Sequence, residues 1–585
     1  MNFINRNTIL LLFVLVFSSS FFIQCNQVKE EKVSFGFLRV EGKEIVNNNG
    51  SVLLRSIGTG NWLLQEGYMM QSTVAGIHTH TEFRDKLQSI VGEEKTKEFY
   101  KKWNESVFQK SDLDSMKAWG FNSLRVAMHY KWFTNPIEKE QVVNGELTNT
   151  WHEEGFKTID KLLSWCTENN MYLILDMHGA PGGQGKNKDI SDYDETKPSL
   201  WESEENKKKL IALWVKLAER YKDSEWIGGF DLINETNWAF AKGNHPNGCD
   251  TKNNDELWDL HQTMINEIRK VNTNHIIYIS GNCWGNNYQS FENHSLKDVD
   301  SNLVLTFHKY WNNNKDGSIA NWLQMREQFN MPLWMSESGE NSNTWFSDAI
   351  SLFEKNNIGW SWWPVKKSKY NNILKVTTNK EYISLINSWK ENKPLSAKET
   401  FNAVMQYAEN FKTKNCAVAN DVIYAMIHQP ENNTTKPFKE HTINSQILFA
   451  DYDMGKDNFA YHDKISANYH VDGGERKEWN SGKSYRNDGV DIALEEGVPY
   501  VGWTENGEWM QYTITIPKEK EYNFEMNTST VIDNSSLTIE VNNIIVKSSV
   551  LLPNTQGEKN WKKTILKGIS LPKGEINLKI HVENG

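Results

Sequence analysis

Short apolar runs alternate with longer amphipathic stretches over residues 35–395. The runs have the length and continuous hydrophobicity of strands buried on both faces, and the stretches between them repeat apolar residues at helical spacing. Such an alternation predicts a (β/α)8 barrel, or TIM barrel, with enlarged loops. A doubly wound open sheet is the alternative α/β fold, but no glycine-rich nucleotide loop follows the first strand. The expected strands lie at 53–57, 121–126, 172–176, 229–232, 276–279, 303–307, 332–335 and 359–362, and clear helical stretches lie at 156–169, 206–221 and 257–271.

The pattern changes after residue 395. Two helical stretches precede a polar segment rich in Asn, Thr and Pro. From about residue 443, apolar and polar residues alternate with period two in short runs separated by turn residues, as in 509–516, which is typical of a β-sandwich. We therefore expect a barrel at 35–395, a helical connector at 396–440 and a β-sandwich (jelly-roll) module at 441–585.

The first residues have the pattern of an export signal. A basic start is followed by the apolar stretch 9–23, which ends near Cys25, and no later stretch is apolar for long enough to span a bilayer. The residues before Cys25 resemble a bacterial lipobox, although Gln24 stands where a small residue is usual. The resemblance implies a signal peptide at 1–25, a lipid on Cys25 as the only membrane attachment, and a linker at 26–34. The expected location is the outer membrane or cell surface, or else the secreted fraction, and an uncleaved signal-anchor helix is the alternative.

Charge and composition narrow the class of partner. The formal net charge is -11 and there is no long basic run, which argues against nucleic acid. Aromatic residues make up 12% of the chain, which contains 24 tryptophans. A tryptophan side chain offers a flat apolar face that can stack on a sugar ring.

Four cysteines follow Cys25, and their spacing matches no metal-binding motif, which argues against a zinc site. Cys249 and Cys283 are a candidate disulfide because both follow predicted strands on the same face of the barrel. The alternative is that Cys249 and Cys283 are buried free thiols. The other two cysteines are Cys166 and Cys416.

Polar residues recur where the predicted strands end. A barrel of this type carries its chemistry on the C-terminal face, just after the strands. Each residue alone has a structural explanation: Glu235 could cap the next helix, and His178 could be a satisfied core histidine. Their recurrence at the same end of successive strands favours a site. The residues are Arg125, His178, Asn234, Glu235, His308, Tyr310, Glu337 and Trp363.

Two carboxylates stand out because glycosidic cleavage needs a pair, one to protonate the leaving oxygen and one to attack the anomeric carbon or activate water. Glu235 after the fourth strand and Glu337 after the seventh would face each other across the barrel mouth. A separation of about 5 Å would indicate a retaining mechanism, and a much wider one inversion. Glu340 is a rival nucleophile, but Glu337 comes directly off its strand and is preferred.

Several of these segments, in this order, resemble the signature set of glycoside hydrolase family 5. The resemblance covers about residues 35–370 and implies a retaining hydrolase of β-linked glycans that needs no cofactor for catalysis. It implies that Glu235 is the acid/base and Glu337 the nucleophile. It also implies that Arg125 and Tyr310 hold Glu337 and that His178 and His308 complete the hydrogen-bond network. In the same family pattern, Asn234 binds the sugar 2-hydroxyl and Trp363 contacts the sugar. We also expect Arg125 and Tyr310 to favour the charged form of Glu337, whereas Glu235 keeps its proton. The segments that carry the resemblance are 176–179, 234–235, 307–310, 332–339 and 359–363.

The stretch 60–69 resembles the start of family members that act on β-glucans, including exo-acting β-1,3-glucanases. We therefore expect a β-glucan polysaccharide or oligosaccharide as substrate, with cellulase-type β-1,4 cleavage first and an exo-β-1,3 activity as the alternative. Endo or exo action stays open. A transglycosylase and a non-catalytic surface glycan-binding protein are the other readings. Loop tryptophans that could serve as sugar platforms are Trp62, Trp238, Trp284 and Trp345.

The C-terminal part resembles carbohydrate-binding module family 6 in the segments 450–453, 460–463, 485–492 and 507–509. The resemblance implies that Trp561 stacks on a glycan. An Asn on the last strand usually assists, but the chain stops at Asn584-Gly585, where we expect that strand to be incomplete. Ala450 stands where the family usually has a Glu, which argues against a structural calcium ion. The alternative is a sandwich that only stabilises the barrel.

Overall fold

The computed structural model describes residues 35–585 except 251–254, 290, 369–370, 444–445 and 471–474. The predicted signal peptide, its Cys25 and the linker 26–34 lie outside the described residues. Residues Gly36–Gly585 form one compact unit. Within the described ranges, every helix is too short or too polar to cross a membrane.

In the described part of the chain, eight parallel strands form one sheet in the order β4-β13-β12-β11-β10-β9-β8-β5. An isolated parallel bridge between Gly58 and Arg125 joins its two edges and closes the barrel. The predicted (β/α)8 fold is confirmed, and each expected apolar run overlaps one of these strands. The strands are β4 (Arg55–Ile57), β5 (Ser123–His129), β8 (Tyr172–Gly179), β9 (Ile227–Asp231), β10 (Ile277–Ser280), β11 (Leu303–Lys309), β12 (Leu333–Gly339) and β13 (Gly359–Trp363).

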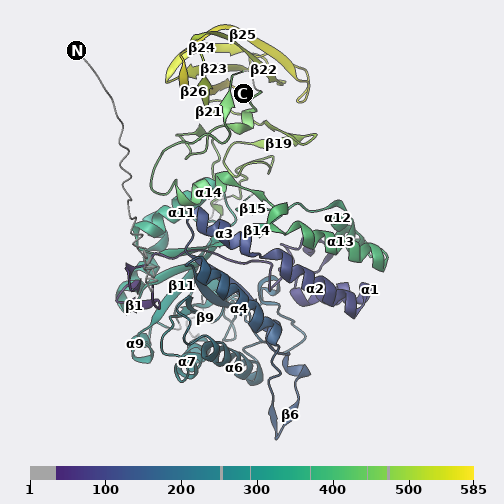
Figure 1. Cartoon of the computed structure of the whole chain (residues 1–585), viewed down its shortest axis with the longest axis vertical. Helices are drawn as coiled ribbons and strands as arrows, with labels where there is room; N and C mark the ends of the chain where they lie inside the picture. The colour runs from purple at the N-terminus through teal and green to yellow at the C-terminus, as the bar shows by residue number, and fades with distance from the viewer. Residues whose placement is uncertain (1–34, 251–254, 290, 369–370, 444–445, 471–474) are drawn as a thin grey trace, which may run out of the picture. The chain divides into compact units, whose positions relative to one another are not determined.

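Amphipathic helices cover the outside of this sheet, as α4, α6 and α7 do in Figure 1. In α4 the buried residues Phe156, Ile159, Leu162 and Cys166 recur every three or four positions, so that one face meets the strands. The helices up to the last barrel strand are α1 (His80–Val91), α2 (Glu93–Val107), α3 (Lys110–Trp119), α4 (Glu153–Glu168), α5 (Lys188–Ser191), α6 (Glu204–Arg220), α7 (Asp255–Arg269), α8 (Asn282–Gly285), α9 (Leu296–Val299), α10 (Ala320–Phe329) and α11 (Asn343–Lys355).

Short strands outside the eight-stranded sheet accompany the barrel. The strands β1 to β3 pair with one another, and Leu38 and Ile45 from this segment pack on barrel residues such as Tyr278 and Trp334. This small cluster closes one end of the barrel with apolar side chains. The short strands are β1 (Arg39–Glu41), β2 (Glu44–Asn47), β3 (Gly50–Ser51), β6 (Val142–Val143), β7 (Glu146–Leu147), β14 (Lys366–Lys367), β15 (Leu374–Lys375) and β16 (Ala417–Val418).

The helices after the barrel strands are α12 (Lys380–Lys390), α13 (Ala397–Asn410) and α14 (Asn420–Ile427). Their buried side chains belong to the same hydrophobic cluster as the barrel core. Tyr407 of α13 stacks on Tyr382 of α12 with ring centroids 3.8 Å apart, and α13 lies alongside α2 (Figure 1). The helices of the expected connector therefore extend the barrel's packing.

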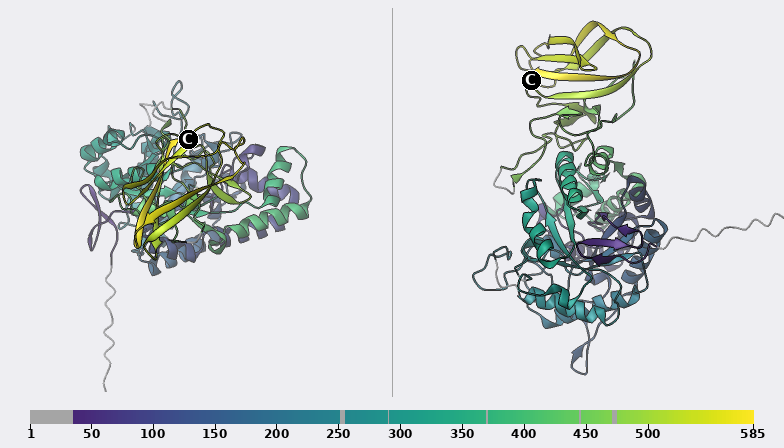
Figure 2. Two further views of the ribbon diagram at one scale, coloured as in Figure 1. Left: turned by 90° about the horizontal axis from the view of Figure 1, so that it is seen from above. Right: turned by 90° about the vertical axis from the view of Figure 1, so that its left-hand side faces the viewer.

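The C-terminal residues form the predicted β-sandwich module, which has a hydrophobic core of its own. Ile576, Leu578, Ile580 and Val582 alternate with more exposed residues along β26, so period two places them in that core. Its strands, green to yellow in Figure 2, are β17 (His441–Thr442), β18 (Tyr461–His462), β19 (Ile492–Glu495), β20 (Val498–Val501), β21 (Trp509–Ile516), β22 (Lys520–Thr528), β23 (Ser536–Val541), β24 (Ile544–Leu551), β25 (Lys562–Leu571) and β26 (Gly574–Asn584).

The last strand of the module, β26, runs to Asn584 and pairs with β21 from Gly574 to His581. Ile576 and its apolar partners provide enough burial to fix the strand up to the final residues. Ala450 lies in the same core, with its side chain buried.

Candidate active site

The carboxyl ends of the barrel strands gather the residues that the sequence predicts there. Two strands change register at these ends, between Phe307 and His308 and between Met335 and Ser338. Bulges of this kind redirect side chains and are common beside active sites. The predicted residues are Arg125 on β5, His178 on β8, Asn234 and Glu235 after β9, His308 on β11, Tyr310 after β11, Glu337 on β12 and Trp363 on β13.

Arg125 is the centre of the hydrogen-bond network. Its Nη1 donates to Oε2 of Glu337 at 2.8 Å, and its Nη2 donates to Oδ1 of Asn234 at 2.8 Å. Its Nε donates to Asp231 at 2.9 Å, and Nη2 also lies 3.0 Å from Asp176. The side chain is 1% exposed, and a buried guanidinium is tolerated because carboxylates surround it. Arg125 therefore fixes Glu337 and the orientation of the Asn234 amide together.

Glu337 is held by donors on both oxygens, since the Tyr310 hydroxyl donates to Oε1 at 3.0 Å. Burial raises the pKa of Glu337 above its ordinary value, while the neighbouring His308 and Arg125 act to lower it. From the sequence we expected a charged Glu337 beside a protonated Glu235. Burial in fact raises the pKa of both, and the difference lies in how many donors compensate each carboxylate.

Glu235 has less compensation. Its Oε1 lies 2.6 Å from Nδ1 of His308, and its φ of 41° is uncommon outside glycine. Burial raises the pKa of Glu235 to about 8, and the attraction of Arg125 is opposed by the charges of Asp176 and Glu340. Burial also lowers the pKa of His308 to about 4, so the ring is neutral near pH 7. Glu235 therefore keeps its proton at neutral pH.

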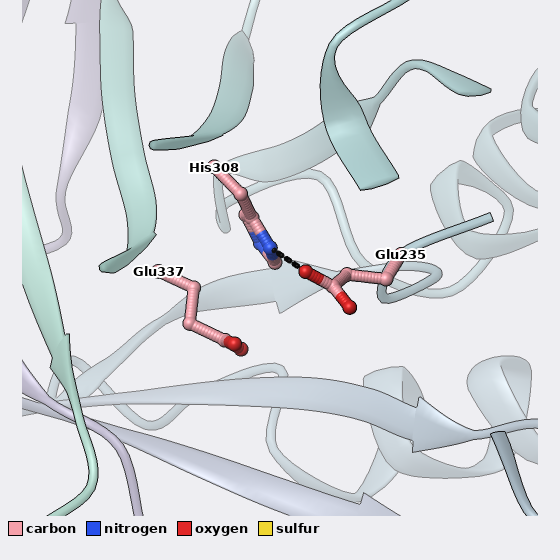
Figure 3. A group of neighbouring side chains, drawn as sticks. All are labelled: Glu235, His308 and Glu337. Carbon is pink, nitrogen blue, oxygen red and sulfur yellow. Dashed lines mark hydrogen bonds and ion pairs between the residues drawn. The ribbon is translucent and has the colours of Figure 1, made fainter. Parts of the chain in front are cut away.

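The two carboxylates face each other (Figure 3). An oxygen of Glu235, an oxygen of Glu337 and a ring nitrogen of His308 all lie within 4.8 Å of one another. This is shorter than the ~6.5 Å or more that leaves room for a water in an inverting enzyme. The same three residues are the one group in the described ranges with the spacing of a metal site. The direct contact between His308 and Glu235 already engages one atom of each.

His178 and Trp363 form a wall of the site. Their rings stack with centroids 4.8 Å apart and planes 6° apart. Nδ1 of His178 lies 2.8 Å from Asp176, and Nε2 lies 3.3 Å from the Asn234 amide nitrogen. Burial lowers the pKa of His178 to about 3, so its neutral ring can accept the amide proton. The indole nitrogen of Trp363 donates to the Tyr68 hydroxyl at 3.2 Å.

Glu66 is a site residue that we did not predict from the sequence. Glu66 is buried, its Oε1 has no hydrogen-bond partner among the described residues, and this atom lies 3.8 Å from Nε2 of His178. Burial and then the charges of Glu337 and Glu235 raise the pKa of Glu66 well above its ordinary value. Glu66 lies nine residues after the end of β4, in a loop that folds back to the site. A search limited to the residues directly after each strand therefore does not reach it.

Glu340 occupies a different position from Glu337. Its carboxylate pairs with Nζ of Lys367, and that ammonium lies 5.2 Å from the centre of the Tyr68 ring. Arg125 and Tyr310 donate to Glu337, which leaves Glu340 as a charge beside the pair.

Three of the four candidate platform tryptophans are buried, namely Trp62, Trp238 and Trp345. Trp284 is only partly buried, and its backbone nitrogen donates to the Thr236 carbonyl at 3.0 Å. Its neighbour Cys283 forms a disulfide with Cys249, which confirms that candidate pair. Cys166 and Cys416 are free thiols.

In the module, Trp561 is 41% exposed. Its indole nitrogen donates to Glu495 at 2.7 Å, and its ring meets Tyr500 edge to face with centroids 5.5 Å apart. The strands β19 and β20 thus supply an aromatic and an acidic neighbour to the predicted stacking residue.

A buried carboxylate pair at the C-terminal face of a (β/α)8 barrel, with one member held by Arg and Tyr, defines a glycoside hydrolase. Residues 80–369 match the cellulase model of glycosyl hydrolase family 5, and residues 481–585 match carbohydrate binding module family 6. The barrel belongs to glycoside hydrolase family 5, and the chain carries a family 6 module.

Individual relatives are distant. A β-xylosidase from Phanerodontia chrysosporium is 23% identical over 404 residues, which cover 63% of this chain and 78% of the relative. Endoglucanase C from Acetivibrio thermocellus is 27% identical over 215 residues, which cover 36% of this chain and 53% of the relative. The solved structure of a β-glucanase from Saccharophagus degradans matches with 15% identity and a TM-score of 0.37, over 64% of this chain and 94% of that one.

Proposed function

We propose that this glycoside hydrolase cleaves a β-glucan with retention of configuration, with Glu337 as the nucleophile and Glu235 as the acid/base. The observation that carries the proposal is the pair of carboxylates with oxygens within 4.8 Å and unequal surroundings. Glu337 accepts hydrogen bonds from Arg125 and Tyr310, whereas Glu235 has a pKa raised to about 8.

In the first step, an oxygen of Glu337 attacks the anomeric carbon while Glu235 gives its proton to the glycosidic oxygen. The carbon–oxygen bond breaks, the leaving sugar departs as an alcohol, and the remaining sugar is esterified to Glu337. Ester formation removes the negative charge of Glu337, so the repulsion that disfavours an ionised Glu235 falls. In the second step, Glu235 takes a proton from water, the water oxygen attacks the same carbon, and Glu337 is released as a carboxylate.

The surrounding residues orient the sugar. We assign Asn234 to the 2-hydroxyl, because Arg125 holds its oxygen and its nitrogen lies beside His178 in the wall of the site. Trp363, stacked on His178, offers a face to the sugar ring. Glu66 adds an acceptor for a substrate hydroxyl, because its Oε1 is buried and has no hydrogen-bond partner within the described ranges.

The substrate class rests on the cellulase family match and on the stretch 60–69 of the first loop. We propose β-1,4 cleavage, with an exo-β-1,3 activity on the same scaffold as the alternative. The module is proposed to hold the polymer through Trp561, and the chain is proposed to be exported and attached to a membrane through a lipid on Cys25. Replacement of Cys25 by Ser should move the protein from the membrane fraction to the soluble fraction, and unchanged partition would contradict the lipid.

The test of the main proposal is product analysis on β-1,4-, mixed-linkage and β-1,3-glucans, with an aryl β-xyloside as a further substrate. Wild type should cut at least one glucan, and Glu337→Gln should lose about 10³-fold or more in kcat. Glu256→Gln, an exposed change on α7, is the matched control and should retain wild-type activity. NMR of the first-formed product should show the retained anomer and would also reveal transfer to a second sugar. An inverted anomer, or full activity in Glu337→Gln, would rule out the assigned nucleophile.

A further inference from the structure

The loop that follows Glu337 packs against the C-terminal module. Asn341, Ser342 and Asn343 come four to six residues after Glu337, and Ser342 caps α11, which begins at Asn343. Each of the three is at most 1% exposed. Polar side chains buried this completely need hydrogen-bond partners, and here most partners belong to the module.

Asn487 of the module makes three of these hydrogen bonds. Its Nδ2 donates to the Asn341 carbonyl and to Oδ1 of Asn343, each at 3.0 Å. Its own carbonyl accepts the Asn343 backbone N–H at 2.9 Å. A second module residue, Asn468, exchanges two hydrogen bonds with the Asn341 side chain, at 2.8 Å and 3.1 Å.

The module's interior holds its side of this contact rigidly. Asp488 accepts from Nδ2 of Asn343 at 2.7 Å and from Nη2 of Arg486 at 2.6 Å. Arg486 is fully buried, and its guanidinium lies 3.7 Å from the centre of the Tyr452 ring. The donors and acceptors presented to the barrel are therefore fixed by the core of the sandwich.

A second contact reaches the other flank of the nucleophile. The Trp311 ring packs against His470 of the module, with centroids 5.0 Å apart, and it also meets the ring of Tyr310, with centroids 5.5 Å apart. Tyr310 is the donor to Glu337. The indole nitrogen of Trp311 also donates to the carbonyl of Glu340, next to Asn341, so the two contacts meet in one loop.

We propose that the module positions the nucleophile of the barrel, with Asn487 and Asn341 as positioning residues, independently of glycan binding at Trp561. The amide of Asn343 also donates to Asp421 of α14 at 3.1 Å, but most partners of the buried Asn341 and Asn343 amides belong to the module. The conformation of the loop after Glu337 therefore depends on that docking. The inference rests on the proposed role of Glu337.

The first test, in the full chain, combines three variants. Asn487→Ala removes both Nδ2 hydrogen bonds to the loop, Asn341→Ala removes the two hydrogen bonds to Asn468, and the third variant carries both changes. The substrate is a short aryl β-cellobioside, or the aryl glycoside that wild type cleaves, so that binding to polymer plays no part. We expect each single variant to lower kcat about tenfold to a hundredfold with KM within about twofold, because a small displacement of the nucleophile slows the chemical step. The double variant should be little worse than either single one.

His470→Ala is a further test variant that leaves the buried amides intact. It removes the ring contact with Trp311 and should lower kcat by a smaller factor than Asn487→Ala. Asn527→Ala, an exposed change on β22 of the same module, is the matched control and should keep wild-type kcat and KM. Wild-type kcat in Asn487→Ala and His470→Ala, with normal circular dichroism, would overturn the proposal.

Calorimetry separates failure of this inference from failure of the proposed function, because it needs no activity. Wild type should unfold with the barrel and module in one cooperative transition, and Asn487→Ala should split it into two. Two independent transitions in wild type would overturn the inference even if the enzyme is a β-glucan hydrolase. One transition that splits in the variant would support it even if the substrate is a different glycan.

Discussion

At the scale of single residues, the site shows how two identical side chains acquire different chemistry. Glu235 and Glu337 are both buried, and burial raises the pKa of each. Arg125 and Tyr310 donate to Glu337, whereas Glu235 faces the neutral ring of His308. The proposed division of roles therefore rests on the donors around each carboxylate and not on burial.

The pKa of Glu235 predicts the alkaline limb of the pH profile. Because the acid must be protonated to assist the leaving group, kcat/KM should fall about tenfold per pH unit above about pH 8. The limb should be clear with an unactivated oligosaccharide and weaker with a dinitrophenyl glycoside, whose leaving group needs little protonation. Equal limbs for the two substrates would contradict the assignment of Glu235 as the acid.

The same shift predicts a stability effect. The native state holds the Glu235 proton up to about pH 8, whereas the unfolded chain releases it near pH 4.5, so the native state is progressively destabilised between these values. Glu235→Gln removes this cost. At pH 8.5 the variant should melt at a higher temperature than wild type, and its unfolding free energy should be larger by an amount of order 1 kcal/mol or more. Near pH 4.5 its stability should approach that of wild type.

Differential scanning fluorimetry across this pH range measures the effect. Glu256→Gln on the exposed face of α7 controls for the loss of one carboxylate. A Glu235→Gln variant that is less stable than wild type at pH 8.5, or a difference that does not change with pH, would show that Glu235 is ionised at neutral pH in the native state.

At the scale of elements, the barrel strands could be predicted because each is a continuous apolar run, such as 172–176 and 303–307. The strand-end rule then found Glu235 and Glu337. It missed Glu66, because a long loop returns that residue to the site. The packing of α13 was also missed, since helical periodicity identifies an apolar face but not the surface that it meets.

That packing predicts the behaviour of Tyr407→Ala. Tyr407 is buried between Tyr382 and Trp103, so its truncation should cost roughly 3–5 kcal/mol of unfolding free energy. Chemical denaturation measures this value. The exposed Gln406→Ala on the same helix is the control and should change stability by less than about 0.5 kcal/mol. A small effect of Tyr407→Ala would mean that α13 only connects the barrel to the module and does not stabilise the barrel.

At the scale of the whole molecule, the change of period after residue 395 predicted the sandwich, and the family resemblance predicted a glycan-binding surface at Trp561. The contact between Asn341 and Asn487 could not be predicted, because 146 residues separate them and neither local period nor composition reports on such pairs.

The two faces of the module predict separable defects. Trp561→Ala should weaken binding to an insoluble glucan about tenfold and raise KM on the polymer, because a stacked ring contributes on the order of 1–2 kcal/mol. Its kcat on a short aryl glycoside is the internal control. Pull-down on the insoluble glucan measures binding, and unchanged retention would assign the polymer contact to another surface. Asn527→Ala controls for changes on the outside of the sandwich.

The buried amides of Asn341 and Asn343 also bear on how such a chain can be recombined. A binding module joined by a free linker can be exchanged for another as an independent cassette. Here an exchanged module must supply the counterparts of Asn468, Asn487 and Asp488, or the recipient barrel must be redesigned from Asn341 to Asn343. If the module positions the loop after Glu337 as proposed, barrel and module have to be exchanged together. A chimera that respects only the family boundaries would join two folded parts with mismatched hydrogen-bonding surfaces.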